Sequence, residues 1–150
     1  MHIPPIPGVI IAILSLLAFT GCQDEADTGI VFGEGKITIG GRTIKVQEAI
    51  TVPQMAQGLM YRRSLDKDRG MIFIYSQPVT SSFWMKDTHI PLSIAFINSE
   101  GRIISIQDME PDNDRKTYAP PRPFLYALEM NQGWFKSNNI RVGDKVVIQN

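Results

Sequence analysis

The chain has 150 residues, of which 43% are apolar, with 15 basic and 15 acidic side chains and a single cysteine. This length fits one domain, and the composition excludes a collagen-like, disulfide-rich or wholly disordered chain. Zero net charge argues against a nucleic-acid-binding protein, because such proteins are normally basic. A lone cysteine can form neither an internal disulfide nor, by itself, a zinc site.

The N-terminal 22 residues contain no Asp, Glu, Lys or Arg, and residues 9–19 form an apolar run broken only by Ser15. A helix of that length measures about 16 Å, which is half of a bilayer core. The run is therefore too short to span a membrane and is typical of the hydrophobic region of a signal peptide. The next four residues, Phe19-Thr20-Gly21-Cys22, resemble a bacterial lipobox. This resemblance implies that Cys22 begins the mature protein and carries the lipid.

We accordingly predict a lipoprotein signal peptide over residues 1–21, and a lipidated cysteine with an acidic flexible tether over residues 22–35. Residues 23–35 contain four acidic side chains, three glycines and no basic side chain, a composition that favours a flexible linker. By analogy with other lipoproteins, Gln23 after the cysteine implies the periplasmic side of the outer membrane. Residues 36–150, which hold the other 11 acidic and all 15 basic side chains, are expected to form one β-rich domain.

From residue 36 onward, apolar and polar residues alternate as in half-buried strands. Strands are predicted at 37–39 and 43–49, on either side of a Gly40-Gly41 turn. Thr51 is predicted to cap a short helix with Pro53 in its first turn. Further strands are expected at 71–75, 82–87, 92–98, 102–109, 125–130 and 145–148, with a helical turn over 133–139. About eight short strands and one or two minor helices predict a mainly β fold, either a β-sandwich or a small barrel.

Several segments together resemble the bacterial and archaeal domain of unknown function 192 family. They are G-L-M-Y-R-R-S-L at 58–65, G-M-I-F-I-Y at 70–75, F-W-M-K-D-T-H-I-P-L-S-I-A-F at 83–96 and A-L-E-M-N-Q-G-W-F at 127–135, with Tyr118 and Gly143-Asp144. The resemblance covers about residues 45–150. It implies a compact β-sandwich-like domain that is often lipid-anchored or secreted, and it supplies no reaction. The chain departs from the family pattern at Asp87, where Asn is usual, and at Ser93, where Asp is usual.

Charged residues interrupt the apolar segment 83–96 at Lys86, Asp87 and His89. If this segment is a strand, Asp87 and His89 share one face. An Asp beside a His can orient its ring and stabilise its protonated form, as general bases require. However, the chain has no serine elbow and no H-E-x-x-H motif to complete a catalytic site. A loop-end ion pair that holds two strands in register remains the alternative.

Glu129 is a second charge inside an apolar segment. It is either a site carboxylate facing Arg62, Arg63 or Lys86, or an outward-facing strand residue whose two neighbours point inward.

Three aromatic side chains, Trp84, Tyr118 and Trp134, either line a groove for a sugar or peptide or fill the core. We expect one of them to be exposed in a pocket.

These observations predict a lipid-anchored periplasmic binding or accessory module rather than an enzyme. Its ligand site is expected at Lys86, Asp87, His89 and Glu129, with Arg62, Tyr118 and Trp84 as further members. The expected ligand is an envelope polymer or peptide, with no cofactor, metal or nucleic acid, and the expected state is a monomer. Two alternatives are an envelope hydrolase or transferase using Asp87 and His89, and a copper(I) carrier in which Met and His side chains bind the soft cation.

Overall fold

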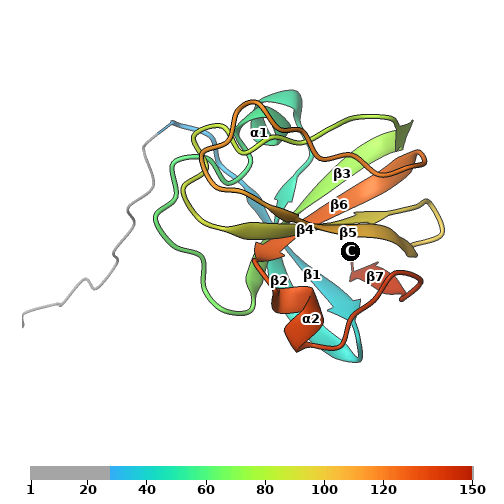
Figure 1. Ribbon diagram of the computed structural model, residues 1–150. Coiled ribbons are helices and arrows are strands. Elements are labelled where there is room, and N and C mark those ends of the chain that lie inside the picture. The colour runs from blue at the N-terminus through green and yellow to red at the C-terminus, as the bar shows by residue number, and fades with distance from the viewer. Residues whose placement is uncertain (1–27, 150) are drawn as a thin grey trace, which may run out of the picture.

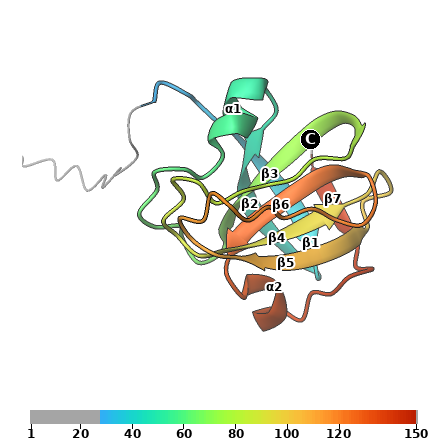
Figure 2. The ribbon, with the colours of Figure 1, turned by 45° about the horizontal axis from the view of Figure 1, so that its top comes forward.

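Seven strands form a single sheet that curls into a half-barrel, with one short helix at each of two opposite ends (Figures 1 and 2). This computed structural model describes residues 28–149, so the predicted signal peptide and Cys22 lie outside the described residues. The strands are β1 (Gly33–Ile39), β2 (Arg42–Ala49), β3 (Arg69–Val79), β4 (Leu92–Ile97), β5 (Ile103–Met109), β6 (Phe124–Asn131) and β7 (Val146–Gln149). The helices are α1 (Val52–Gln57) and α2 (Trp134–Ser137). The prediction of a mainly β fold is confirmed.

The strand order across the sheet is β5-β4-β6-β3-β2-β1-β7. All neighbouring strands are antiparallel except β2 and β3, which are parallel because the chain crosses over through α1 between them. The two ends of the sheet meet where Arg102 and Lys145 form an isolated bridge. There the Ile103 amide donates to the Asp144 carbonyl at 3.0 Å, and the Val146 amide donates to the Gly101 carbonyl at 2.8 Å. These bonds hold the curvature of the half-barrel.

Local sequence explains the first hairpin and the first helix as predicted. Gly40 and Gly41 both have positive φ, 55° and 74°, which a two-residue hairpin turn of this kind requires. The Thr51 side chain accepts a hydrogen bond from the Gln54 amide, and the Gln54 side chain accepts one from the Thr51 amide. This capping box satisfies two backbone donors at the start of α1.

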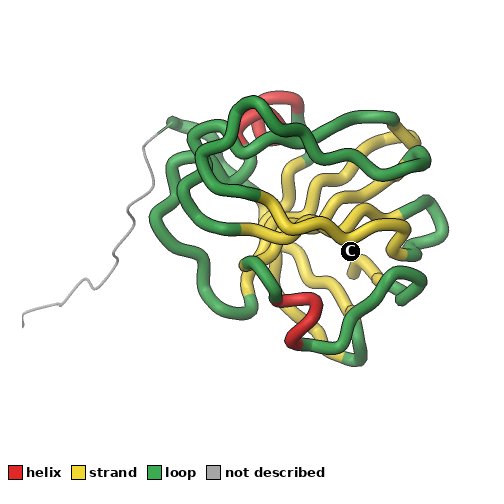
Figure 3. Tube along the Cα trace, in the orientation of Figure 1, coloured by secondary structure: helices red, strands yellow, loops and turns green. Residues whose placement is uncertain are grey.

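Each face of the sheet is covered by its own apolar cluster. One cluster includes Ile103 of β5 and Val146 of β7, so the sheet curls around it, and Trp134 and Phe135 of α2 pack against it. The other cluster lies under α1 and the long loops that cross the upper side of the sheet in Figure 3. Strand β4, which lies between β5 and β6, is consequently buried on both faces along its whole length.

Two sequence predictions about element boundaries were wrong. Residues 82–87 form no strand beyond a single bridge between Phe83 and Tyr118, because the chain turns at Asp87, whose φ of 51° is incompatible with a strand. The sheet therefore has seven strands instead of about eight. Residues 33–35, expected in the flexible tether, belong to β1, where Gly33 and Gly35 pair with Glu48 and Val46 of β2.

Candidate functional site

Glu129 is an acid buried in the sheet. It lies on β6 between Met71 of β3 and Ile94 of β4, and both of these cross-strand neighbours are fully buried. The Glu129 side chain shares the loop-covered face of the sheet, and only 5% of the residue is exposed. β3 approaches β6 closely here because Gly70 has no side chain: a Cβ atom would lie 2.4 Å from the Glu129 carbonyl oxygen.

Burial raises the pKa of Glu129 to about 8, and the positive charge of Arg62 acts in the opposite direction. No hydrogen bond within residues 28–149 reaches this carboxylate to offset the loss of its hydration. Glu129 is thus a carboxylic acid that stays largely protonated near neutral pH, with a single opposing charge nearby.

Arg62 is positioned by the tight segment that follows α1. The chain reverses there through two residues with positive φ, Gly58 at 51° and Tyr61 at 67°. The Tyr61 amide then donates to the Asp87 carbonyl at 2.7 Å, which fixes the segment against the loop before β4. Arg62 follows directly and is 8% exposed.

The N-terminal segment covers this same region. Phe32, just before β1, lies under the Arg62 guanidinium, whose central carbon is 5.8 Å from the centre of the ring. The Gln54 side chain donates to the Val31 carbonyl at 2.7 Å and so attaches the segment to α1. Residues of the predicted tether therefore pack beside the buried Arg62.

Asp87 lies at the surface above the segment carrying Arg62. Its carboxylate accepts a hydrogen bond from the Tyr61 hydroxyl at 3.4 Å. The positive φ of Asp87 explains why Asn and Asp suit this position, since these residues adopt the left-handed conformation more readily than other non-glycine residues. Beside it, the Lys86 ammonium lies 5.5 Å from the centre of the exposed Trp84 ring.

His89 pairs with an acid of the loop after β5 and not with Asp87. Its Nδ1 atom lies 2.7 Å from Oδ1 of Asp112, and both side chains are more than half exposed. The Asp87 carboxylate is bound instead to Tyr61, so the two members of the predicted acid–base pair contact different partners.

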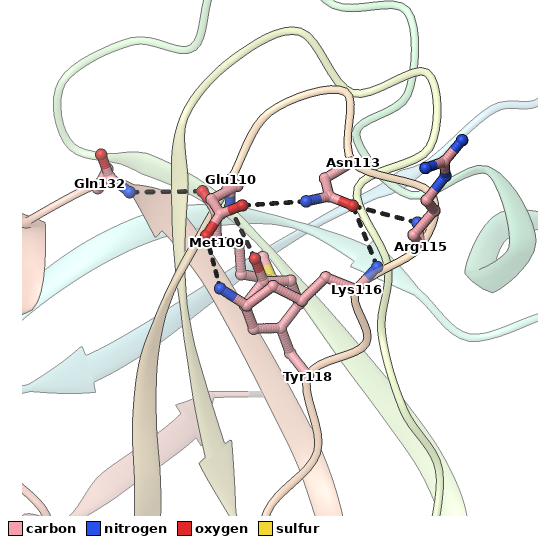
Figure 4. A network of polar contacts seen from close by, with 7 residues as sticks. All are labelled: Met109, Glu110, Asn113, Arg115, Lys116, Tyr118 and Gln132. Carbon is pink, nitrogen blue, oxygen red and sulfur yellow. Dashed lines mark hydrogen bonds and ion pairs between the residues drawn. The ribbon is translucent and has the colours of Figure 1, made fainter.

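Tyr118 contacts and stabilises the loop between β5 and β6 (Figure 4). Its buried hydroxyl accepts a hydrogen bond from the Glu110 amide at 2.9 Å. The Glu110 carboxylate binds Lys116 at 2.6 Å and Asn113 at 3.0 Å, while the Lys116 ammonium lies 5.2 Å from the centre of the Tyr118 ring. The Asn113 side-chain carbonyl also accepts from the Arg115 and Lys116 amides, both at 3.1 Å, so these bonds account for the fold of the loop.

The structure thus brings three of the predicted residues to one region, with Arg62 beside Glu129 in the interior and Asp87 above them through Tyr61. It places His89 and Tyr118 in the neighbouring loop network. Lys86 and Trp84 lie together on the surface, while Trp134 is buried and donates to Asp68 at 2.9 Å. Of the three candidate aromatic residues, Trp84 is the exposed one.

Sequence reasoning missed Tyr61 and Phe32, and it did not predict that Asp112 pairs with His89. Tyr61 lies in a segment used for the family resemblance. It was missed because no sequence pattern indicates its positive φ. Phe32 was assigned to the tether, and Asp112 is 23 positions from His89 in the chain.

The methionine and histidine side chains considered for copper lie in different environments. Met71, Met85 and Met109 are buried in the cluster around Glu129, whereas His89 is exposed and bound to Asp112. Within the described chain, no three His, Cys, Asp or Glu side chains gather closely enough to bind a metal ion.

Ser93, the second departure from the family pattern, stabilises the opposite face. Its buried hydroxyl donates to the Asp108 carboxylate at 2.5 Å and accepts a hydrogen bond from the Gly133 amide at 2.9 Å. These bonds tie β4 and β5 to the start of α2. Ser93 thus stabilises the other face of the sheet and is not part of the Glu129 region.

None of the helices formed by residues 28–149 has the length and apolar character needed to cross a bilayer.

Two solved structures are similar to this chain in both sequence and fold. A crystal structure of a putative transcription regulator from Sinorhizobium meliloti 1021 is 31% identical, covers 79% of this chain and 96% of its own, and gives a TM-score of 0.74. A protein of unknown function from Novosphingobium aromaticivorans is also 31% identical, with 82% and 89% coverage and a TM-score of 0.72. No curated protein matches the sequence. The model of the family DUF192 (Uncharacterized ACR, COG1430) matches residues 35–148, and the chain therefore belongs to this family.

Proposed function

We propose that this protein is a lipid-anchored, periplasm-facing binding module whose ligand site is centred on Glu129 and Arg62. Asp87, Lys86 and Trp84 form the surface part of that site. The ligand is an envelope polymer or peptide that presents a hydrogen-bond donor, such as an amine or amide, to the Glu129 carboxyl group.

The observation that carries this proposal is the burial of Glu129 without a hydrogen bond among the described residues. Burying a carboxyl group without a hydrogen-bond partner is unfavourable by roughly 1–3 kcal/mol. An apolar side chain between Met71 and Ile94 would avoid this penalty. A ligand that donates a hydrogen bond to Glu129 would supply the missing partner. Ligand binding therefore explains why an acid is present at this position, which packing alone does not.

A binding role is favoured over hydrolysis or group transfer by the contacts of the candidate catalytic pair. Acid–base catalysis by Asp87 and His89 requires the carboxylate to orient the imidazole. In the structure Tyr61 binds Asp87, and Asp112 binds His89. The proposal therefore assigns no catalytic step to these residues.

The binding half of the proposal is tested with the full chain carrying Cys22→Ser, which removes the lipid attachment site. This protein is sedimented with purified peptidoglycan sacculi in three forms: with no further change, with Glu129→Met, which removes the hydrogen-bond acceptor, and with Glu100→Met. Glu100 is an exposed acid in the β4–β5 turn and serves as the matched control. We expect Glu129→Met to weaken co-sedimentation at least about tenfold, which corresponds to about 1.4 kcal/mol. Equal binding by all three proteins, or no binding by any of them, would contradict the assignment.

The anchoring half is tested separately by metabolic labelling with palmitate. The wild-type chain is expected to incorporate the label, and Cys22→Ser is expected to lose it. Equal incorporation by the two chains would rule out Cys22 as the attachment site.

A further inference from the structure

Two uncharged stretches of the sequence meet at one end of the half-barrel. Residues 28–33 and residues 49–61 contain no Asp, Glu, Lys or Arg, although 20% of the chain is charged. The Gln54 side chain joins them, because its amide donates to the Val31 carbonyl and its carbonyl accepts from the Ile50 amide at 2.9 Å. Three aliphatic side chains project from this junction into solvent: Val31 (82% exposed), Ile50 (54%) and Val52 (80%). We call these three residues the apex.

Exposed aromatic residues and a lysine lie in segments that pack near the end of α1. Gly58, at the end of α1, lies against the Phe73 ring, which packs at 4.9 Å on Phe83, the neighbour of Trp84. Tyr61 follows Gly58 by three residues and Trp84 follows Phe83 directly, and both side chains are exposed. Trp and Tyr are favoured at membrane–water interfaces, where an apolar ring and a polar tip are both solvated, and Lys86 beside Trp84 can contact anionic headgroups.

The position of the proposed lipid identifies what covers this surface. Only five residues lie between Cys22 and Thr28, the first described residue, so a fully extended chain spans about 20 Å. A domain of this length has a radius of gyration of about 13 Å and is therefore wider than the tether is long. Figure 1 shows the chain entering beside α1, with α2 on the opposite side. The end that carries the apex is consequently the end closest to the bilayer.

We propose that the apex docks on the membrane surface, with Val31, Ile50 and Val52 inserted among the lipid headgroups and upper acyl chains. This inference rests on the lipid anchor of the proposed function. Three aliphatic side chains bind a bilayer weakly by themselves. A tether this short holds them at an effective concentration in the millimolar range, at which weak docking is populated. Docking fixes the orientation of the domain and places the Arg62–Glu129 region next to the membrane.

The test compares two exposed valines at opposite ends of the molecule. In the lipidated full chain, acylation of Cys22 leaves no free thiol, so Val52→Cys or Val142→Cys each provides a single site for an environment-sensitive fluorophore. Val142 is 58% exposed and lies in the loop after α2, away from α1. Both proteins are placed in vesicles of phosphatidylethanolamine and phosphatidylglycerol, with and without spin-labelled quencher lipids.

We expect a blue-shifted and lipid-quenched emission from position 52, and emission at position 142 like that of the protein in buffer. Equal emission at the two positions, in a protein that still floats with the vesicles, would overturn docking while leaving the anchor intact. A protein that does not float would overturn the anchor and docking together. Hydrogen exchange of the unlabelled lipidated protein provides a check free of substitutions, since docking predicts slower exchange over residues 49–57 in vesicles than in detergent.

Discussion

Two glutamates of this protein, Glu110 and Glu129, have carboxyl groups whose pKa values are shifted in opposite directions by their surroundings. Glu110 is an exposed residue of the loop after β5, and its bonds to Lys116 and Asn113 lower its pKa. Glu129 is buried in the sheet, and loss of hydration raises its pKa to about 8. The loop surrounds its acid with partners, whereas the sheet leaves its acid with the charge of Arg62 as the one opposing influence on its pKa.

The Glu110 carboxylate contributes to the fold of its loop, whereas the buried Glu129 carboxyl group is unfavourable for folding when it ionises. The network of Figure 4 explains the path of the loop without any ligand. Glu129 instead lowers stability wherever it must ionise, and a site that binds a ligand is where such a residue is commonly retained. The difference between the two acids can be measured as follows.

The largest effect is expected from Glu129→Gln as a function of pH. In the unfolded chain the carboxyl group ionises near its ordinary pKa of 4.5, but in the folded protein it ionises near 8. The folded state binds the extra proton in between, so Glu129 makes stability fall as pH rises from about 4.5 to about 8, by on the order of 5 kcal/mol. Denaturant unfolding of both proteins at several pH values checks this. Glu129→Gln should lack this decline, and parallel stability curves would show that Glu129 is already ionised or well solvated in the fold.

A smaller loss is expected from Tyr118→Phe, which probes the loop side of the comparison. The substitution keeps the buried ring but removes the hydroxyl that accepts the Glu110 amide. Losing that bond should cost about 1 kcal/mol in the free energy of unfolding. Tyr126→Phe is a suitable control, because Tyr126 is a half-buried tyrosine on β6. A loss no greater than that of the control would mean that the Tyr118 hydroxyl does not stabilise the loop.

The smallest effect is expected from Glu110→Gln at neutral pH. Because Glu110 and Lys116 are exposed, solvent and salt screen their attraction, and an unfolding midpoint close to that of the wild type is expected. Any stabilisation by the lowered pKa of Glu110 is present above its ordinary value and is lost as pH falls through the lowered one, opposite in sign to Glu129. A midpoint shift as large as that of Tyr118→Phe would show that the ion pair, and not the tyrosine, holds the loop.

Much of the architecture could be predicted from local patterns. The Gly40-Gly41 turn, the Thr51 cap and the alternation over residues 43–49 depend on residues close in the chain, and each is found where expected. Residues 82–87 were assigned to a strand because their apolar character resembles one. The actual turn at Asp87 depends on contacts with Tyr61, 26 positions away.

The candidate site was only partly predictable for the same reason. Alternation along β6 suggested that Glu129 points outward, since Leu128 and Met130 point into a core. The structure shows a core on both faces, so Glu129 is buried as well. The neighbours of Asp87 and His89 also come from other loops, which alternation within one segment cannot reveal.

By itself, the sequence determined the mainly β class, the family and most strand positions, because short-range periodicity and turn chemistry encode these features. Tertiary structure decided which charges are partnered and which are not. An acidic side chain on a strand can be solvated, paired with a lysine or buried under a second apolar layer. Which of these occurs depends on the loops that fold over that face of the sheet. Here α1 and the loops cover one side of the sheet completely enough to bury Glu129 beneath them. That coverage, rather than any pattern around position 129, makes this glutamate the centre of the proposed site.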